Sequence, residues 1–120
     1  MRYMMFIKHT QDYQNAQVPA SLYEAMGKFI EDATKSGNFI EGAGLQPTAA
    51  GSRVKLRGGR ITVVDGPFVE SKEIVGGYAI IEAASKEEAL RLARRFMELH
   101  VEHWPTFEGE CEVRPFELEP

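Results

Sequence analysis

Two segments of the chain, residues 2–8 and 74–82, carry apolar side chains on both faces that a β-strand presents. In the first, one face holds Tyr3, Met5 and Ile7, and the other holds Met4 and Phe6. In the second, one face holds Tyr78 and Ile80, and the other holds Val75, Ala79 and Ile81. Strands of this kind need an apolar cover on each side, which predicts that both lie in the middle of a sheet.

Two helices are indicated by the same starting signal. The pattern Ser-x-x-Glu occurs at Ser21–Glu24 and at Ser85–Glu88, where the hydroxyl and the carboxylate can satisfy free N–H groups of a first helical turn. Apolar residues then recur at helical spacing after each signal: Leu22, Met26, Phe29, Ile30 and Ala33 after the first, and Ala89, Leu92, Ala93 and Phe96 after the second. Gly37 is a natural end for the first helix.

A hairpin is expected between the two halves, in "RVKLRGGRITVV" (53–64), with Gly58-Gly59 at the turn. This register places Leu56 opposite Ile61 and Val54 opposite Val63 on one face. Further strands are expected at 39–45 and 111–117, so each helix lies between two strands. The order strand-helix-strand, hairpin, strand-helix-strand predicts an α+β ferredoxin-like sandwich, an antiparallel sheet with two helices on one face.

One face of this sheet is then left without helices. Four strands at about 4.8 Å spacing are about 19 Å wide, and two helices of about 10 Å cover one face of that width. A bare face with the composition of residues 2–8 and 74–82 is a large apolar patch. We therefore expect a homodimer in which a second copy covers the helix-free face. In the alternative, the hairpin and the segment 100–109, which is either helix or loop, fold over this face within one chain.

Length and composition narrow the class of protein. The chain of 120 residues has one cysteine, Cys111, and a formal charge of −4, which predicts a single domain over 1–120 without an internal disulfide. The acidic balance argues against nucleic acid or an anionic membrane as partner. No apolar run approaches the roughly 18 residues that cross a bilayer, and no leader pattern follows Arg2. We expect a cytoplasmic protein.

Four stretches of the sequence resemble one known family, the YCII-related proteins, and within it the DGPF branch of small bacterial proteins. They are "EGAGLQP" (41–47), "DGPFVESKEIVGGYAIIEA" (65–83), "SKEEALRLARRF" (85–96) and "EVRPFE" (112–117). The resemblance covers nearly the whole chain and implies a dimeric ferredoxin-like α/β barrel. Some wider YCII-related proteins are proposed to use a His–Asp pair with the histidine on the first helix. Residues 20–37 contain no histidine, so that pair is not transferred.

Asp65 is the first candidate for chemistry. An aspartate before a turn usually accepts a hydrogen bond from the backbone two residues ahead, but that residue is Pro67, which has no N–H. The carboxylate then bonds the Phe68 N–H, meets a cation or faces a cavity. Gly66 suits a backbone that bends sharply or lies close to a neighbour. Asp65 is either a general acid or base at a cavity mouth or a residue that stabilises the turn.

The histidines form the second set of candidates. His9 ends the first strand, and His100 and His103 share a face if the second helix continues that far. A histidine near Asp65 would shuttle a proton, whereas a structural role beside Trp104 is the alternative. An H-x-x-H pair by itself is a weak metal signal, so we expect no metal. The candidates are Asp65, His9 and His103 for catalysis, and Phe68, Lys72, His100 and Trp104 for ligand binding, with Trp104 either stacking on a flat ligand or packing in the core.

Two functions remain open. The first is acid–base chemistry on a small molecule, in a cavity near the dimer interface and without a bound cofactor, since the sequence has no phosphate loop and no dinucleotide fingerprint. The second is a non-catalytic module of the same fold that binds a small aromatic or anionic ligand or a protein partner. The first requires a carboxylate and an imidazole within reach of each other in a concave site.

Overall fold

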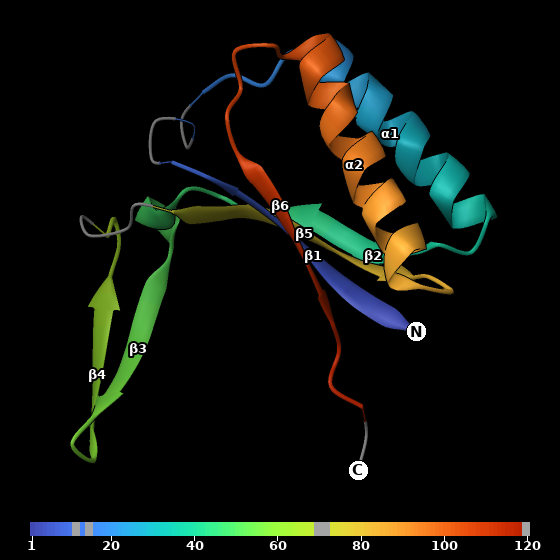
Figure 1. The fold of residues 1–120 in the computed structure, drawn as a ribbon. Coiled ribbons are helices and arrows are strands. Elements are labelled where there is room, and N and C mark those ends of the chain that lie inside the picture. The colour runs from blue at the N-terminus through green and yellow to red at the C-terminus, as the bar shows by residue number, and fades with distance from the viewer. Residues whose placement is uncertain (11–12, 14–15, 69–72, 119–120) are drawn as a thin grey trace.

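The computed structural model describes residues 1–10, 13, 16–68 and 73–118. In this part of the chain a four-stranded antiparallel sheet carries two α-helices on one face, and a separate two-stranded hairpin leaves one end of the sheet (Figure 1). In chain order the elements are β1 (Arg2–His9), α1 (Ala20–Lys35), β2 (Phe39–Gly44), the 3-10 helix η2 (Thr48–Ala50), β3 (Ser52–Arg57), β4 (Arg60–Asp65), β5 (Ile74–Glu82), α2 (Lys86–His103) and β6 (Glu110–Pro115).

The strand order of the sheet is β2-β5-β1-β6. The two segments that are apolar on both faces, β1 and β5, pair with each other at its centre, as their pattern predicts. On the helix side Tyr3 and Met5 of β1 lie opposite Ile81 and Ala79 of β5, and most of this surface is buried against α2. The predicted ferredoxin-like α+β fold with two helices on one face is confirmed.

An irregular pairing between β1 and β5 changes which side chains face the helices. Ile7 pairs with Gly77 but Lys8 pairs with Val75, so Gly76 is skipped. Beyond this bulge the alternation is shifted by one residue, which is the usual effect of an extra residue in one strand. The prediction that Val75 shares a face with Ala79 and Ile81 is therefore wrong, because Val75 lies with Lys8 on the helix-free side.

The two helix starts differ from each other. Ser85 accepts a hydrogen bond from the Glu88 N–H (3.2 Å), and α2 begins at the next residue as predicted. The corresponding prediction for Ser21 is wrong: α1 begins at Ala20, its N-cap is Pro19, and no side chain caps it. Ser21 already lies within the first turn, where its hydroxyl cannot reach the free N–H groups.

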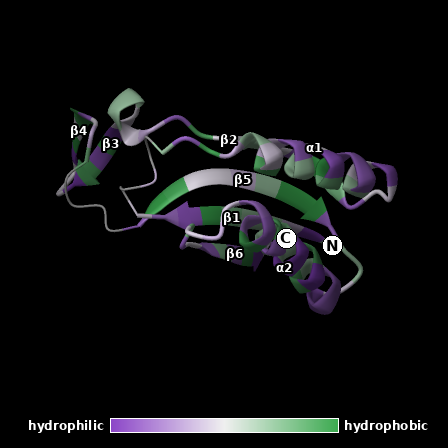
Figure 2. Ribbon diagram, turned by 90° about the horizontal axis from the view of Figure 1, so that it is seen from above, coloured by the Kyte–Doolittle hydropathy of each residue, from purple (hydrophilic) through white to green (hydrophobic). Residues whose placement is uncertain are grey.

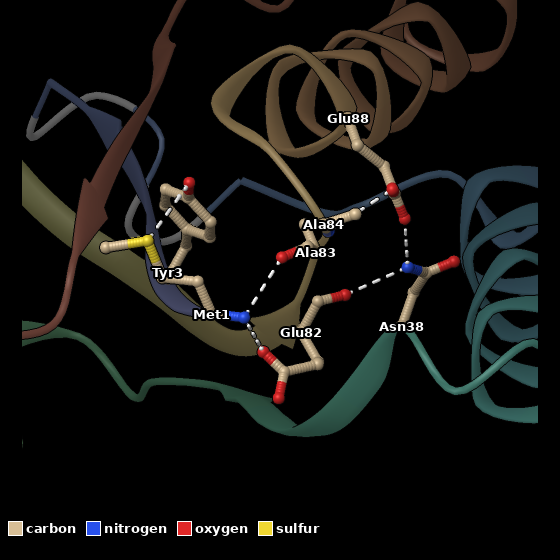
Figure 3. A network of polar contacts seen from close by, with 7 residues as sticks. All are labelled: Met1, Tyr3, Asn38, Glu82, Ala83, Ala84 and Glu88. Carbon is tan, nitrogen blue, oxygen red and sulfur yellow. Dashed lines mark hydrogen bonds and ion pairs between the residues drawn. The ribbon is translucent and has the colours of Figure 1, made fainter.

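Asn38 links the start of α2 to the end of β5. Its side-chain amide donates to the Glu82 carbonyl oxygen (2.9 Å) and to the Glu88 carboxylate (2.8 Å) (Figure 3). Glu88 also accepts from the Ala84 N–H (3.2 Å). These bonds favour the ionised carboxylate, so the Asn38 amide first and the Ala84 N–H second lower the pKa of Glu88.

The hairpin has the predicted register. Leu56 pairs with Ile61 and Val54 with Val63, and the turn glycines have positive φ, 57° at Gly58 and 75° at Gly59. The hairpin runs away from the sheet on the side opposite the helices (Figure 1) and lies beyond the end of the sheet (Figure 2).

The alternative in which the hairpin and the segment 100–109 cover the helix-free face within one chain is therefore not observed. The hairpin leaves that face open, and of the segment 100–109 the residues up to His103 continue α2 on the opposite side. No helix within the described ranges is long and apolar enough to span a bilayer.

Candidate functional site

A cavity of about 490 Å³ lies between the sheet and the two helices. Its floor is poor in bulky side chains, and its walls come from both helices. The floor includes Gly42, Ala43, Gly44, Gly77 and Ala79, and the walls include Met26, Phe29, Ile30, Leu92 and Phe96. The gap exists because small residues on β2 and β5 face large ones on α1. We expected a cavity beside a second copy, but this one lies on the helix-covered face.

His9 and His100 are the two histidines that line this cavity. His9 Nδ1 lies 2.8 Å from the Thr10 carbonyl oxygen, and His100 Nδ1 lies 3.1 Å from the Phe96 carbonyl oxygen. A carbonyl oxygen only accepts, so each Nδ1 carries the proton and donates it. When the rings are neutral, the lone pair is on Nε2. Both imidazoles can therefore accept a hydrogen bond or a proton through Nε2.

His100 is buried, with 7% of its surface exposed. Burial lowers its pKa, and the bond to the Phe96 carbonyl opposes this shift only in part. The ring is thus neutral at neutral pH. Among the described residues that line the cavity there is no Lys, Arg, Asp or Glu, so nothing charged on the cavity wall favours the imidazolium.

Gly76 determines where the His9 ring can lie. A Cβ atom at this position would overlap the ring, at 2.6 Å from His9 Cδ2 and closer still to Nε2. The His9 imidazole therefore rests against the bare backbone of β5, at the bulge. Our sequence reasoning did not identify this role, although two consecutive glycines inside a strand are a signal for close approach.

Aromatic rings extend the site beyond the two histidines. A second cavity of about 130 Å³ is lined by both histidines together with Tyr13, Trp104 and Phe107. The Phe107 ring centroid lies 5.0 Å from those of His100, Tyr13 and Trp104. Contacts at this distance favour a fixed arrangement of the rings. Trp104 thus lines the second cavity, in a ring cluster that is itself packed.

Tyr13 is not among the candidates predicted from the sequence, because the segment around it is otherwise polar. Its hydroxyl donates to the Thr106 carbonyl oxygen and accepts from the Glu108 N–H, both at 3.1 Å. These two bonds hold the segment after β1 against the turn after α2. Both hydrogen-bonding roles of the hydroxyl are therefore used within the chain.

Asp65 lies elsewhere, at the base of the hairpin. Its carboxylate accepts a hydrogen bond from the Ser52 hydroxyl (2.7 Å), directly across the β3–β4 pair. This is none of the three partners that we expected. Phe68 lies beneath the Arg53 guanidinium, 3.8 Å from its central carbon to the ring centroid. Among the described residues, no hydrogen bond joins Asp65 to a histidine, and neither Asp65 nor Phe68 lines either cavity.

The remaining candidates do not join the cavity. His103 lies on α2 with its Nε2 3.9 Å from a Glu102 carboxylate oxygen, and it lines neither cavity. Lys72 lies outside the described residues. In the part of the chain that is described, no group of three His, Cys, Asp or Glu side chains is arranged to hold a metal ion. Burial raises the pKa of Cys111 to about 11, which leaves its thiol protonated and a poor nucleophile.

The fold and the cavity define a small ferredoxin-like α+β protein with an apolar site beneath its helices. The family model of the YCII-related domain matches residues 1–99, and the chain belongs to the YCII-related family. A protein of Rhizobium meliloti (strain 1021), described as uncharacterized, is 33% identical over 105 residues, which are 88% of this chain and 77% of that protein. Membership of the family establishes no activity.

Proposed function

We propose that the protein binds a small, neutral and largely apolar molecule in the cavity between the sheet and the helices. The observation that carries this proposal is His100, an imidazole on the cavity wall whose Nε2 makes no hydrogen bond among the described residues. The residue as a whole is buried, but Nε2 is not among the enclosed atoms, so a ligand in the cavity can reach it. A ligand with a donor group would fit this atom, and about 490 Å³ is a common size for a small-molecule site.

The chemistry of the two imidazoles indicates which ligands fit. Both present an acceptor, so the complementary group on the ligand is a donor such as O–H or N–H. A carboxylate ligand would lose its hydration without meeting a cation on the described cavity wall. Of the aromatic and anionic ligands expected from the sequence, the site therefore favours the aromatic ones, with a hydroxyl or amine rather than an acid group.

Proton transfer is the second candidate function. The Phe96 carbonyl fixes the tautomer of His100, and its lowered pKa keeps Nε2 unprotonated at neutral pH. Such a nitrogen can take a proton from a bound hydroxyl or an activated C–H. Asp65 lines neither cavity, so this proposal gives it no part in the proton transfer. The second imidazole that lines the cavity is that of His9.

Binding is tested by thermal shift with phenol, p-cresol and benzoate. His100→Phe removes the acceptor, and His103→Phe on the same helix is the matched control outside both cavities. A ligand at about 100 times its Kd stabilises the fold by about 2.7 kcal/mol, which is about 10 °C for a chain of this size. We expect this shift from the phenols in the wild type and in His103→Phe, and a much smaller one in His100→Phe.

Two results decide between the candidate functions. If no probe shifts the wild-type Tm, or if His100→Phe responds like the wild type, binding at this site is wrong. Exchange of probe C–H protons with D2O, followed by NMR, reports proton transfer. Exchange that is lost in His100→Phe and retained in His103→Phe favours chemistry over binding alone.

The proposed assembly is a homodimer through the helix-free face. Met4 pairs with Ile80 and Phe6 with Tyr78 on this side of the sheet, and the Arg114 guanidinium lies over the Phe6 ring at 5.5 Å. An apolar centre with a polar edge is the usual anatomy of a protein interface. Sedimentation velocity over a dilution series tests this, and a single-chain mass at all concentrations would contradict it.

A further inference from the structure

One face of the β3–β4 hairpin is apolar and bare. Its four members are the cross-strand pairs Val54–Val63 and Leu56–Ile61, with exposed fractions of 72%, 66%, 73% and 69% in that order. Scattered exposed apolar residues are ordinary, but four in contact on one surface form a patch. The hairpin is a sheet of its own, so no further strand of the described chain covers it.

The two strands of the hairpin are held together at its base. The Gly66 N–H donates to the Gly51 carbonyl oxygen (2.8 Å), and the Gly66 backbone lies so close to Thr48 that an added Cβ would be 2.8 Å from the Thr48 carbonyl carbon. With the Asp65–Ser52 bond, these contacts close the base of the hairpin beside η2. A surface that is already formed before binding loses less conformational entropy when it meets a partner.

The charges of the hairpin lie on its other face. Residues 52–65 contain three Arg, one Lys and one Asp, and the cations alternate with the apolar pairs along the two strands. They therefore stay in water when the apolar face is covered, which makes an apolar surface the fitting partner. The helix-free face of a second copy, where Met4 pairs with Ile80 and Phe6 with Tyr78, is such a surface.

The area of the helix-free face leads to the same partner. At about 3.3 Å per residue and about 4.8 Å between strands, the four-stranded sheet offers about 460 Å² on one face and the hairpin about 190 Å². A stable complex buries about 800 Å² on each partner. The sheet face by itself falls well short of this figure, and the hairpin face supplies roughly half of the difference.

We propose that the hairpin is an arm that packs its apolar face on the body of a second copy of this chain. Across a two-fold axis each subunit gives one arm and receives one, so the contact forms twice. The arm extends on the same side as the helix-free face (Figure 1), where a stacked second copy would lie. The inference goes beyond contact between the two sheets and does not depend on a ligand in the cavity.

The test compares two double variants by sedimentation velocity. Leu56→Thr with Ile61→Thr removes apolar surface from the bare face and keeps β-propensity. Lys55→Thr with Arg60→Thr changes the opposite face at the same pair of strands. Runs at about 0.5 M salt screen the exposed charges, so the control should keep the wild-type dissociation constant.

The expected result is a dimer in the wild type and in the control, with a dissociation constant at least about 100-fold higher in Leu56→Thr/Ile61→Thr, because each dimer loses four apolar side chains from its contacts. Near-ultraviolet circular dichroism at monomeric concentration should be unchanged, since these side chains are exposed in the single chain. A wild-type dissociation constant in the apolar variant overturns the arm while leaving the sheet-face dimer standing. A monomeric wild type overturns both.

Discussion

Gly66→Ala is the sharpest test of whether the DGPF corner closes the base of the hairpin. The added methyl group would overlap the Thr48 carbonyl oxygen and lie 2.8 Å from the Thr48 carbonyl carbon and 3.3 Å from the Gly51 carbonyl oxygen. All three of these atoms belong to the backbone, so no change of rotamer relieves the clash. Either η2 or the base of the hairpin must move.

The magnitude follows from two terms. Forcing one extra methyl group into a packed site costs about 1–3 kcal/mol. Moving the base apart also breaks the bond from the Gly66 N–H to the Gly51 carbonyl oxygen, which costs about 0.5–1.5 kcal/mol. Together they give about 1.5–4.5 kcal/mol, or about 10- to 1,600-fold in the equilibrium for opening the hairpin base.

Amide hydrogen exchange of β3 and β4 measures this opening directly. We expect faster exchange of the hairpin amides by the stated factor in Gly66→Ala, with the centre of the main sheet less affected. Asp65→Asn should change the exchange little, because the Asn oxygen can still accept from the Ser52 hydroxyl. Gly27→Ala, on α1 where a Cβ meets nothing within 4 Å, is the control outside the hairpin; it should favour the helix and leave exchange of the hairpin amides unchanged. Wild-type exchange in Gly66→Ala would refute a closing role for the DGPF corner.

Three further predictions concern the cavity and the start of α2. Gly76→Ala should turn the His9 ring away and lower phenol affinity at nearly unchanged Tm, because the group displaced is a movable side chain; equal affinity in isothermal titration would contradict this. The pKa of His100 is lower in the folded chain than in the unfolded chain. As pH falls below about 6.5, the unfolded chain therefore takes up the proton first. The free energy of unfolding then decreases with decreasing pH, by at most about 1.4 kcal/mol per pH unit. The urea midpoints at pH 7.5 and pH 5.5 should therefore differ less in His100→Phe than in the wild type. An equal difference in the two proteins would show that protonation of His100 does not cause the loss of stability. The lowered pKa of Glu88 stabilises the fold above the unfolded carboxyl pKa, and this stabilisation disappears as pH falls through the folded value; Asn38→Ala should therefore lose less Tm than the wild type between pH 5 and pH 3.

The fold was predictable where short-range rules decide it. Ser85 caps α2 because three residues suffice to place a hydroxyl beside an N–H, and the register of the hairpin follows from the two turn glycines. The same capping pattern was misleading at Ser21. There Pro19 precedes the helix and α1 starts one residue earlier than the pattern indicates, since Pro suits the entry to a helix as well.

The site was less predictable because it depends on contacts between distant elements. His9 and His100 come together only through the bulge at Gly76 and the full length of α2. Local turn rules for Asp65 consider the residues just ahead of it, whereas its partner Ser52 lies across the hairpin. His103, one turn from His100 in sequence, falls outside the cavity, because three residues along a helix leave a side chain rotated from its neighbour.

The hairpin shares no strand with the main sheet, and this separation has an evolutionary consequence. The hairpin can become longer or shorter, or change its surface residues, without shifting the pairing of any other strand. In the proposed dimer, such changes would alter which subunits pair while the cavity under the helices stays the same. Paralogues with different hairpins would then form separate assemblies.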